Sequence, residues 1–261
     1  MDEDTRVEYI ARFRESDGSP RSLMEHLIST SELASIFSAK IGMPSFGAVM
    51  GLVHDMGKYA KAFQDYIKSS AGHIEPDDDD YVESRKMRGK IDHSSAGAQY
   101  IWHGSGKSNF QQLAANMLAL CIASHHTGLI DCLSPDGTDV ISKRMNKADD
   151  KTHYSDALAC LEDEIRIQAK ELLESPSLEE ELKTIAEQMK HTAVSAATGQ
   201  FALGFLTRFL FSVLIDADRL NSAERTVSAR PDWSLLCGIL EANLAGLRRS
   251  RWQFMRWWRN G

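Results

Sequence analysis

Residues 51–58 read GLVHDMGK and place a histidine and an aspartate side by side at the end of an apolar run, with a glycine and a lysine behind them. The run from Phe46 to Met56 is small and apolar on all sides, which predicts a central, buried helix. Pro44 suits the first turn of that helix, and Gly57 suits its end. The segment therefore predicts a helical protein whose innermost helix carries two polar side chains into the interior.

His54 and Asp55 have the ligand types that suit borderline transition metals. A buried, unpaired carboxylate is costly, so burial of Asp55 makes sense if a cation neutralises it. Neighbouring helical residues point about 100° apart, so the pair can serve two ions or bridge them. The dipeptide thus predicts a metal site at the end of the central helix.

Further histidines and aspartates occur in short, distinctive contexts on either side of this segment. Residues 91–94 read IDHS, residues 123–128 read ASHHTG, residues 214–219 read LIDADR, and His26 follows a capping-box pattern at Ser22–Glu25. Taken singly, His26, His93 and Asp218 are more often ordinary structural residues. The adjacent His125 and His126 are uncommon in a purely structural role, because each ring nitrogen needs a partner. Together, five histidines and two aspartates in apolar helices favour a two-metal hydrolytic centre.

The apolar residues recur with a helical period nearly everywhere, and no stretch alternates for long enough to predict a strand. We therefore predict an all-α fold, a helical bundle with a metal centre between its core helices. One predicted helix starts after Ser22, the central one runs between Pro44 and Gly57, and a third carries Tyr59, Phe63 and Ile67. Further helices are predicted at 94–102, 109–125, 155–174, 177–197, 200–220 and 232–258, with a loop at 71–91 and a floppy segment near 130–152. The predicted domains are 1–225 and a C-terminal helical extension at 226–261.

The composition narrows the class of protein. The chain has 261 residues and a formal net charge of -7, which argues against coating duplex DNA by bulk charge. Its four cysteines include no C-x-x-C pair, which excludes a cysteine zinc ribbon and fits a reducing cytoplasm. The acidic N-terminus has no apolar signal core. The most apolar stretch, Phe201 to Ile215, is interrupted by Arg208 and predicts a buried core helix rather than a membrane span.

Five strings in the chain carry a family resemblance. They are MEHL at 24–27, GLVHDMGK at 51–58 with Phe63 and Gln64 behind it, DHSSAGA at 92–98, SHHTGL at 124–129 and DADRLNS at 216–222. Because these strings occur in the family's order, the chain resembles the HD-type nuclease module of the CRISPR-associated nuclease–helicase of type I interference systems. An HD dipeptide alone would indicate only the broad phosphohydrolase superfamily, whereas the strings at 92–98 and 124–129 are much more specific to the nuclease branch.

The resemblance implies a ligand set for two divalent ions. One ion would take His26, His54, Asp55 and Asp218, and the other would share Asp55 and add His93, His125 and His126. Lys58 matches the family lysine near the scissile phosphate, so Lys58 and Asp55 are the expected catalytic residues. Asp218 is preferred over Asp216 because its spacing to Ser222 fits the family pattern. Ligands rich in histidine favour iron, manganese, cobalt or nickel over magnesium, which prefers oxygen.

The resemblance also implies hydrolysis of phosphodiester bonds in single-stranded DNA, with a helicase domain or subunit and a CRISPR surveillance complex as partners. The expected cytoplasmic location follows from the cysteines instead. Two alternatives remain open from the sequence. One is a nucleotide or cyclic-nucleotide phosphohydrolase of the wider HD superfamily, and the other is a non-catalytic module that docks a helicase or surveillance complex. The basic and aromatic residues at 247–259 could follow a single strand, or they could belong to an amphipathic packing helix.

Overall fold

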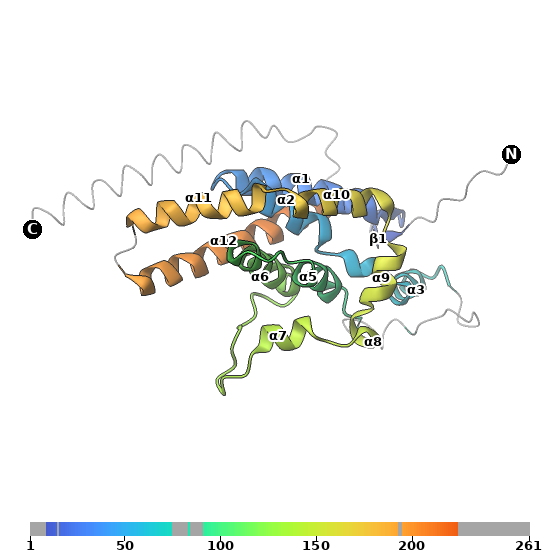
Figure 1. Ribbon diagram of the computed structural model, residues 1–261. Helices are drawn as coiled ribbons and strands as arrows, with labels where there is room; N and C mark the ends of the chain where they lie inside the picture. The colour runs from blue at the N-terminus through green and yellow to red at the C-terminus, as the bar shows by residue number, and fades with distance from the viewer. Residues whose placement is uncertain (1–8, 15, 75–82, 84–90, 193–194, 224–261) are drawn as a thin grey trace, which may run out of the picture. The chain divides into compact units, whose positions relative to one another are not determined.

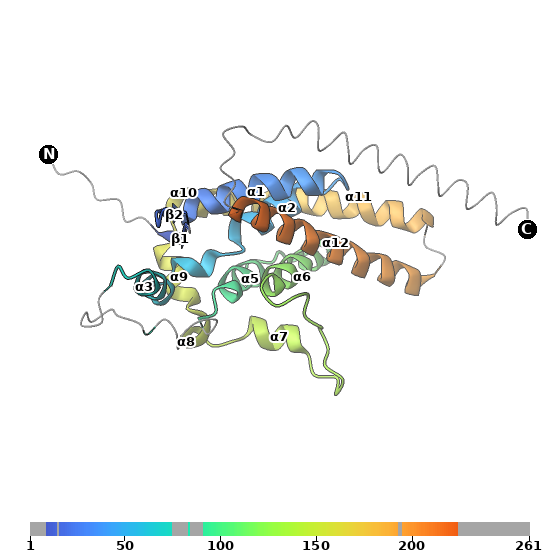
Figure 2. The same cartoon turned by 180° about the vertical axis from the view of Figure 1, so that it is seen from behind.

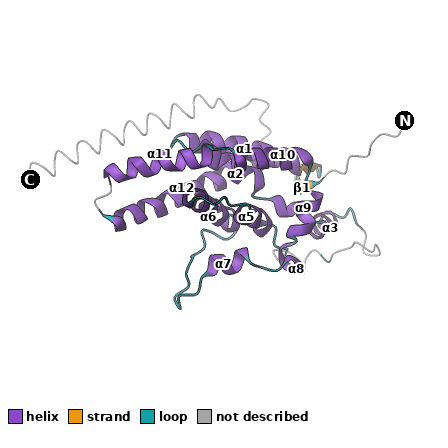
Figure 3. Cartoon of the chain, in the orientation of Figure 1, coloured by secondary structure: helices purple, strands orange, loops and turns teal. Residues whose placement is uncertain are grey.

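A computed structural model describes residues 9–14, 16–74, 83, 91–192 and 195–223, and this part of the chain is predominantly helical (Figures 1 and 3). The all-α prediction is confirmed. In chain order the elements are β1 (Ile10–Phe13), β2 (Pro20–Ser22), α1 (Leu23–Ala39), α2 (Pro44–Val53), the 3-10 helix η1 (Met56–Tyr59), α3 (Lys61–Ser70), α5 (Ser94–His103), α6 (Asn109–Ser124), α7 (Val140–Met145), α8 (Asp149–Thr152), α9 (Tyr154–Cys160), α10 (Asp163–Glu174), α11 (Ser177–Thr192) and α12 (Ala196–Ser222).

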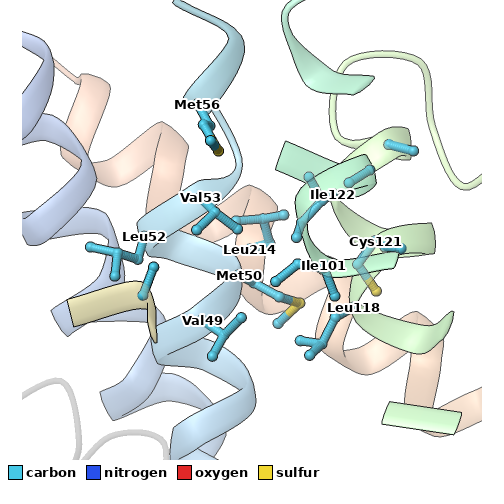
Figure 4. Close-up of a cluster of buried hydrophobic side chains, with 14 of the residues drawn as sticks. Val49, Met50, Leu52, Val53, Met56, Ile101, Leu118, Cys121, Ile122 and Leu214 are labelled. Atoms are coloured by element: carbon cyan, nitrogen blue, oxygen red, sulfur yellow. The ribbon is translucent and has the colours of Figure 1, made fainter. Parts of the chain in front are cut away.

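Helix α2 lies in the middle of the core, as its apolar sequence predicts. Pro44 occupies its first turn, and Phe46, Met50 and Leu52 have no solvent exposure. Figure 4 shows Met50 and Val53 among side chains of α5, α6 and α12. The helix contacts α1, α6, α10, α11 and α12. The residues that directly follow α2 in the chain therefore lie in the interior.

Two glycines allow helices to approach α2 and η1 closely. A Cβ on Gly97 of α5 would lie 1.9 Å from the Val53 carbonyl oxygen, and a Cβ on Gly57 would lie 2.3 Å from the His93 carbonyl oxygen. Both distances are far below van der Waals contact with backbone atoms, which cannot bend away as a flexible side chain can. These glycines therefore hold the start of α5 against the end of α2.

Two short strands were missed by the sequence analysis. Strands β1 and β2 pair antiparallel, and the buried Gln64 side chain bonds to both the amide and the carbonyl of Ile10, each at 3.0 Å. A hairpin this short has too few residues to show an alternating pattern. Its position depends on a side chain 54 positions away in the sequence.

The prediction of a floppy segment near 130–152 was wrong for its second half. Asp139 caps α7 through the Ser142 amide, and Met145 at the end of α7 is fully buried. The Gln99 side chain also donates to the carbonyl oxygens of Met145 and Lys147. The cap, the buried Met145 and the two bonds from Gln99 together hold a segment whose composition is otherwise polar.

The predicted helix at 155–174 is two helices. The chain is extended at Leu161, and Arg166 donates to the carbonyl oxygens of Leu158 and Leu161, which closes the corner between α9 and α10. Here side-chain bonds to the free carbonyls replace the helical bonds that a continuous helix would make.

Helix α12 was predicted to be a buried core helix, but its outer face is exposed. Leu210, Leu214 and Ala217 are buried on the side that contacts α1, α2 and α6, but Phe201 and Phe205 are 74% and 64% exposed. From Ala197 to Ser222 the helix is long and apolar enough to cross a membrane, by length and composition alone. Its buried face places it within the bundle.

Several sequence predictions fall on residues outside the described part of the chain. Most of the predicted loop at 71–91 lies there, as do the helix at 232–258, the 225/226 domain boundary and the whole extension at 226–261.

Candidate metal centre

Helices α1, α2 and α12 bring four of the predicted ligands together, and both views show these helices side by side (Figures 1 and 2). His26 lies in α1, His54 and Asp55 directly follow α2, and Asp218 lies in the last turns of α12. The Nε2 atom of His26 is 3.5 Å from both Asp55 Oδ2 and Asp218 Oδ1, and the Nε2 atom of His54 is 3.3 Å and 3.7 Å from the same two oxygens. We call His26, His54, Asp55 and Asp218 the buried set; their ligand atoms all lie within 4.8 Å of one another.

The other three predicted histidines face the second oxygen of Asp55. His93 caps the start of α5, and His125 and His126 directly follow α6. The distances from Asp55 Oδ1 to their Nε2 atoms are 3.8 Å, 3.3 Å and 3.7 Å, in that order. We call Asp55, His93, His125 and His126 the outer set. Within it, the ligand atoms of Asp55, His93 and His126 lie within 4.8 Å of one another, and His125 lies beside them.

Asp55 therefore joins two clusters of donors through two different oxygens. Its side chain is 2% exposed, and Asp55 Oδ1, His54 Nε2 and His125 Nε2 are buried atoms without a hydrogen-bond partner. Buried polar atoms of this kind are costly unless something binds them. In the outer set, the Nε2 atoms of His93 and His126 are 2.6 Å apart, a distance at which one ring carries the proton that the other accepts. The residues of both sets therefore have the donor atoms and the spacing that could hold divalent cations.

The rings are oriented from behind by their Nδ1 atoms. Those of His54, His93 and His125 lie 2.9 Å, 3.1 Å and 2.7 Å from backbone carbonyl oxygens, which accept their protons. An Nδ1–H donor leaves the Nε2 lone pair of a neutral ring free for a metal ion. Histidines that bind metals generally use one ring nitrogen for the metal and donate the N–H of the other to a carbonyl, a carboxylate or water.

Burial and charge keep most of these rings neutral. Burial lowers the pKa of His26 and His125, and it lowers the pKa of His93 to about 4. His54 differs: burial opposes its charge, but the carboxylates of Asp55 and Asp218 outweigh burial and raise its pKa to about 10. Burial would raise the pKa of Asp55, but Lys58 and His54 hold it well below its usual range. The shared carboxylate is thus ionised and attracts cations.

Lys58 lies at the edge of the centre. Its Nζ atom is 2.8 Å from Asp55 Oδ2 and 3.3 Å from the carbonyl oxygen of Ala11 in β1. Gln64 bonds to the carbonyl of Lys58 as well as to β1, so the hairpin and η1 hold this lysine in place. The predicted lysine therefore contacts the carboxylate that both sets share.

The structure separates the two candidate aspartates of α12. Asp218 faces His26 and His54, whereas Asp216 is exposed. Burial would raise the pKa of Asp218, but His54 and His26 lower it below its usual range. Because Asp216 and Asp218 are two positions apart on a helix, their side chains cannot share a face.

Three supporting residues received no role from the sequence analysis. Asn221 lies 2.9 Å from His26 Nδ1, and Arg21 contacts Asn221. Asp92 accepts from the Ser95 amide and hydroxyl and from Lys147, directly beside His93. Asn221 and Asp92 stand inside the distinctive strings, but nothing in a string distinguishes a ligand from the residue that orients it.

Comparison with known proteins assigns the chain to a family. No curated protein matches it. The family model for the HD domain of Cas3 matches residues 21–225, which is most of the chain and includes all the residues of both sets. This domain family comprises metal-dependent nucleases of CRISPR defence. The chain belongs to the Cas3 HD domain family.

Proposed function

We propose that this chain is a metal-dependent nuclease that hydrolyses phosphodiester bonds of single-stranded DNA in type I CRISPR interference. The observation that carries the proposal is the convergence of histidines from both sets on the two oxygens of one buried carboxylate. Family membership supports nuclease activity in CRISPR defence. The single-stranded substrate is our proposal, because a flexible strand can bend into a centre whose ligands lie at the ends of core helices.

The buried set would hold one ion and the outer set the other, with Asp55 shared. When bound, two such ions lower the pKa of a water molecule and clamp phosphate oxygens. Most of the ligand atoms would be histidine nitrogens, which favours iron, manganese, cobalt or nickel over magnesium. Burial keeps His26, His93 and His125 neutral and ready to bind.

The protein itself contributes orientation and charge. Backbone carbonyls fix the rings of His54, His93 and His125 before an ion arrives, so the rings need not reorient, whereas His54, with its raised pKa, must release its second proton when a metal binds. Lys58 is placed to offset the negative charge that develops on the phosphate during hydrolysis. The half-exposed His126 marks the side from which a substrate reaches the centre, since its side chain is 43% exposed.

Our proposal for partners follows from the family. A helicase domain or subunit would feed the strand to this centre, and a CRISPR surveillance complex would select the DNA, in the cytoplasm. The basic and aromatic extension at 226–261 is a candidate link to such a partner.

The test is degradation of circular single-stranded DNA by metal-stripped protein, with manganese, cobalt, nickel, iron or magnesium added back singly. We expect cleavage with the transition metals and little with magnesium. Asp55→Ala should abolish it while circular dichroism still shows the helical fold. Lys58→Ala should bind metal normally but cleave slowly.

Parallel reactions distinguish the alternatives. Free nucleotides and cyclic dinucleotides are offered to the same preparations, and a nuclease leaves them intact. Turnover of those small substrates with no cleavage of DNA would replace the nuclease by a phosphohydrolase. A wild-type protein that takes up no metal would instead favour a docking module.

A further inference from the structure

Arg21 of β2 and Asn221 of α12 meet directly behind His26, although they are 200 positions apart in the sequence. Arg21 Nη2 lies 2.5 Å from Asn221 Oδ1, and Arg21 Nη1 bonds to the backbone oxygen of Asn221. The same Asn221 Oδ1 lies 2.9 Å from His26 Nδ1. One amide oxygen therefore stands between a guanidinium and an imidazole.

The chemistry of these three groups admits one arrangement of protons. A guanidinium is always a donor, so the amide atom that faces Arg21 must be the oxygen of Asn221. That oxygen can only accept, so His26 must carry its proton on Nδ1. The lone pair of a neutral His26 then lies on Nε2, which faces Asp55 and Asp218.

His26 needs this support because of its place in the fold. His54 and His125 stand at helix ends, where the carbonyl oxygens of Gly51 and Ile122 are available to accept from a ring. His26 lies within α1, where the helical bonds already use the backbone carbonyls. An acceptor for its ring must come from another element.

We infer that Arg21 and Asn221 are positioning residues that fix the tautomer of His26, and through it the affinity of the buried set for a metal ion. This inference rests on the proposed metal centre. Arg21 orients the amide of Asn221, and the amide orients the ring. The pair also ties the hairpin to the end of α12, so His26 becomes a competent ligand only when both are docked.

The test compares Asn221→Leu, which removes the acceptor, with Asn221→Asp, which keeps one. Nitrogen-15 spectra of the histidine rings in metal-free protein report the tautomer, with His26→Gln to assign the signals. Titration with Mn²⁺ reports affinity. We expect Asn221→Leu to lose the Nδ1–H form and to bind the buried-set ion about 10–100-fold more weakly. Asn221→Asp should stay close to wild type in both measurements.

Arg21→Met carries the same test should Asn221→Leu fail to fold, and Arg166→Met is its matched control. Arg166 also donates to two protein oxygens, but it does so at the corner between α9 and α10. We expect weaker Mn²⁺ binding in Arg21→Met and unchanged binding in Arg166→Met.

Wild-type Mn²⁺ affinity in Asn221→Leu, or in Arg21→Met where that variant carries the test, would overturn the inference. Equal weakening in Arg21→Met and Arg166→Met would do the same, because the effect would then be general destabilisation. If wild-type protein binds no Mn²⁺ at all, the proposed function fails, and the ring spectra alone decide: a His26 tautomer that is unchanged in Asn221→Leu overturns the positioning role, and a changed one supports it.

Discussion

The buried set and the outer set share Asp55 but stand on different kinds of structure. His26 and His54 are 3% exposed or less and belong to the packed core around α1 and α2. In the outer set His125 is equally buried, but the side chain of His126 is 43% exposed; His93 and, in the buried set, Asp218 are each 20% exposed. An ion in the buried set would be bound by atoms that cannot move without disturbing the core, so its binding is coupled to folding. An ion in the outer set would lie where a substrate arrives.

The largest effect we predict comes from the residue that both sets share. Asp55→Asn keeps the shape of the side chain but removes its charge and one of its two oxygens. Metal ions supply several kcal/mol of charge stabilisation, so we expect cleavage to fall about a thousandfold or more. Calorimetry with Mn²⁺ should show that both ions are lost.

The metal-free Asp55→Asn variant should be less stable than metal-free wild type near neutral pH, because Lys58 and His54 lose the buried carboxylate that pairs with them. Thermal unfolding of both proteins in the presence of a chelator measures this. A variant that still binds two ions would show that the sets do not depend on a shared carboxylate.

Thermal unfolding separates the two sets directly. Ligand bound only to the folded state raises stability, by about 2.7 kcal/mol at 100 times Kd. We expect Mn²⁺ to stabilise wild type, and His26→Gln to lose most of that gain because His26 belongs to the core. His126→Gln should keep most of the gain and still lose cleavage. Equal losses of stabilisation in the two variants would remove the distinction between the sets.

A third prediction concerns the contact that holds the outer set near the core. Gly57→Ala places a Cβ 2.3 Å from the His93 carbonyl oxygen. Such overpacking costs about 1–3 kcal/mol, and the start of α5 must shift, so cleavage should fall more than Mn²⁺ binding by the buried set. Denaturant unfolding and the DNA assay measure the two effects.

Gly204→Ala is the matched control, because Gly204 lies in α12 with nothing within 4 Å of the added Cβ. This change should be neutral or slightly stabilising, since alanine favours helix. Comparable damage from the two substitutions would mean that the approach of Gly57 to His93 has no special role.

Periodicity predicted the helical class, and local signals indicated His54, Asp55, His125 and His126, whereas His26, His93, Asp218 and the division into two sets depended on the family resemblance. His54 and Asp55 end an apolar run, and His125 and His126 are adjacent, so each string could be recognised without knowledge of its partners. The resemblance implied that both sets share Asp55, but which of its oxygens faces which histidines depends on how α2, α6 and α12 pack and could not be predicted.

The supporting residues were missed for a related reason. Arg21 and Asn221 meet only in three dimensions, and the β1–β2 hairpin is stabilised by Gln64 from α3. The break at Leu161 and the order around Met145 likewise depend on single side-chain bonds and one buried methionine. The spacing of apolar residues shows which face of a helix is buried, whereas these features depend on single contacts between residues far apart in the sequence.

The smallest effect we predict is a pH dependence at the outer set. Burial alone would raise the pKa of Asp92, but the bonds from Lys147 and Ser95 lower it to about 2. A carboxylate with a depressed pKa stabilises the fold above its unfolded pKa and loses that contribution as the pH falls through the folded value. The stability advantage of wild type over Asp92→Asn should therefore be complete near neutrality and shrink as the pH falls below about 4 toward 2.

Urea unfolding of both proteins at stepped pH measures this difference, with Asp136→Asn as control. Asp136 also has a lowered pKa, through Ser134 and Thr138, but its loop is exposed and distant from His93 in the chain. Because Asp92 directly precedes His93 and bonds to the first turn of α5, Asp92→Asn should also weaken cleavage at pH 7, whereas Asp136→Asn should leave it unchanged. A pH-independent stability difference, with normal cleavage, would show that the outer set does not depend on the Asp92–Lys147 pair.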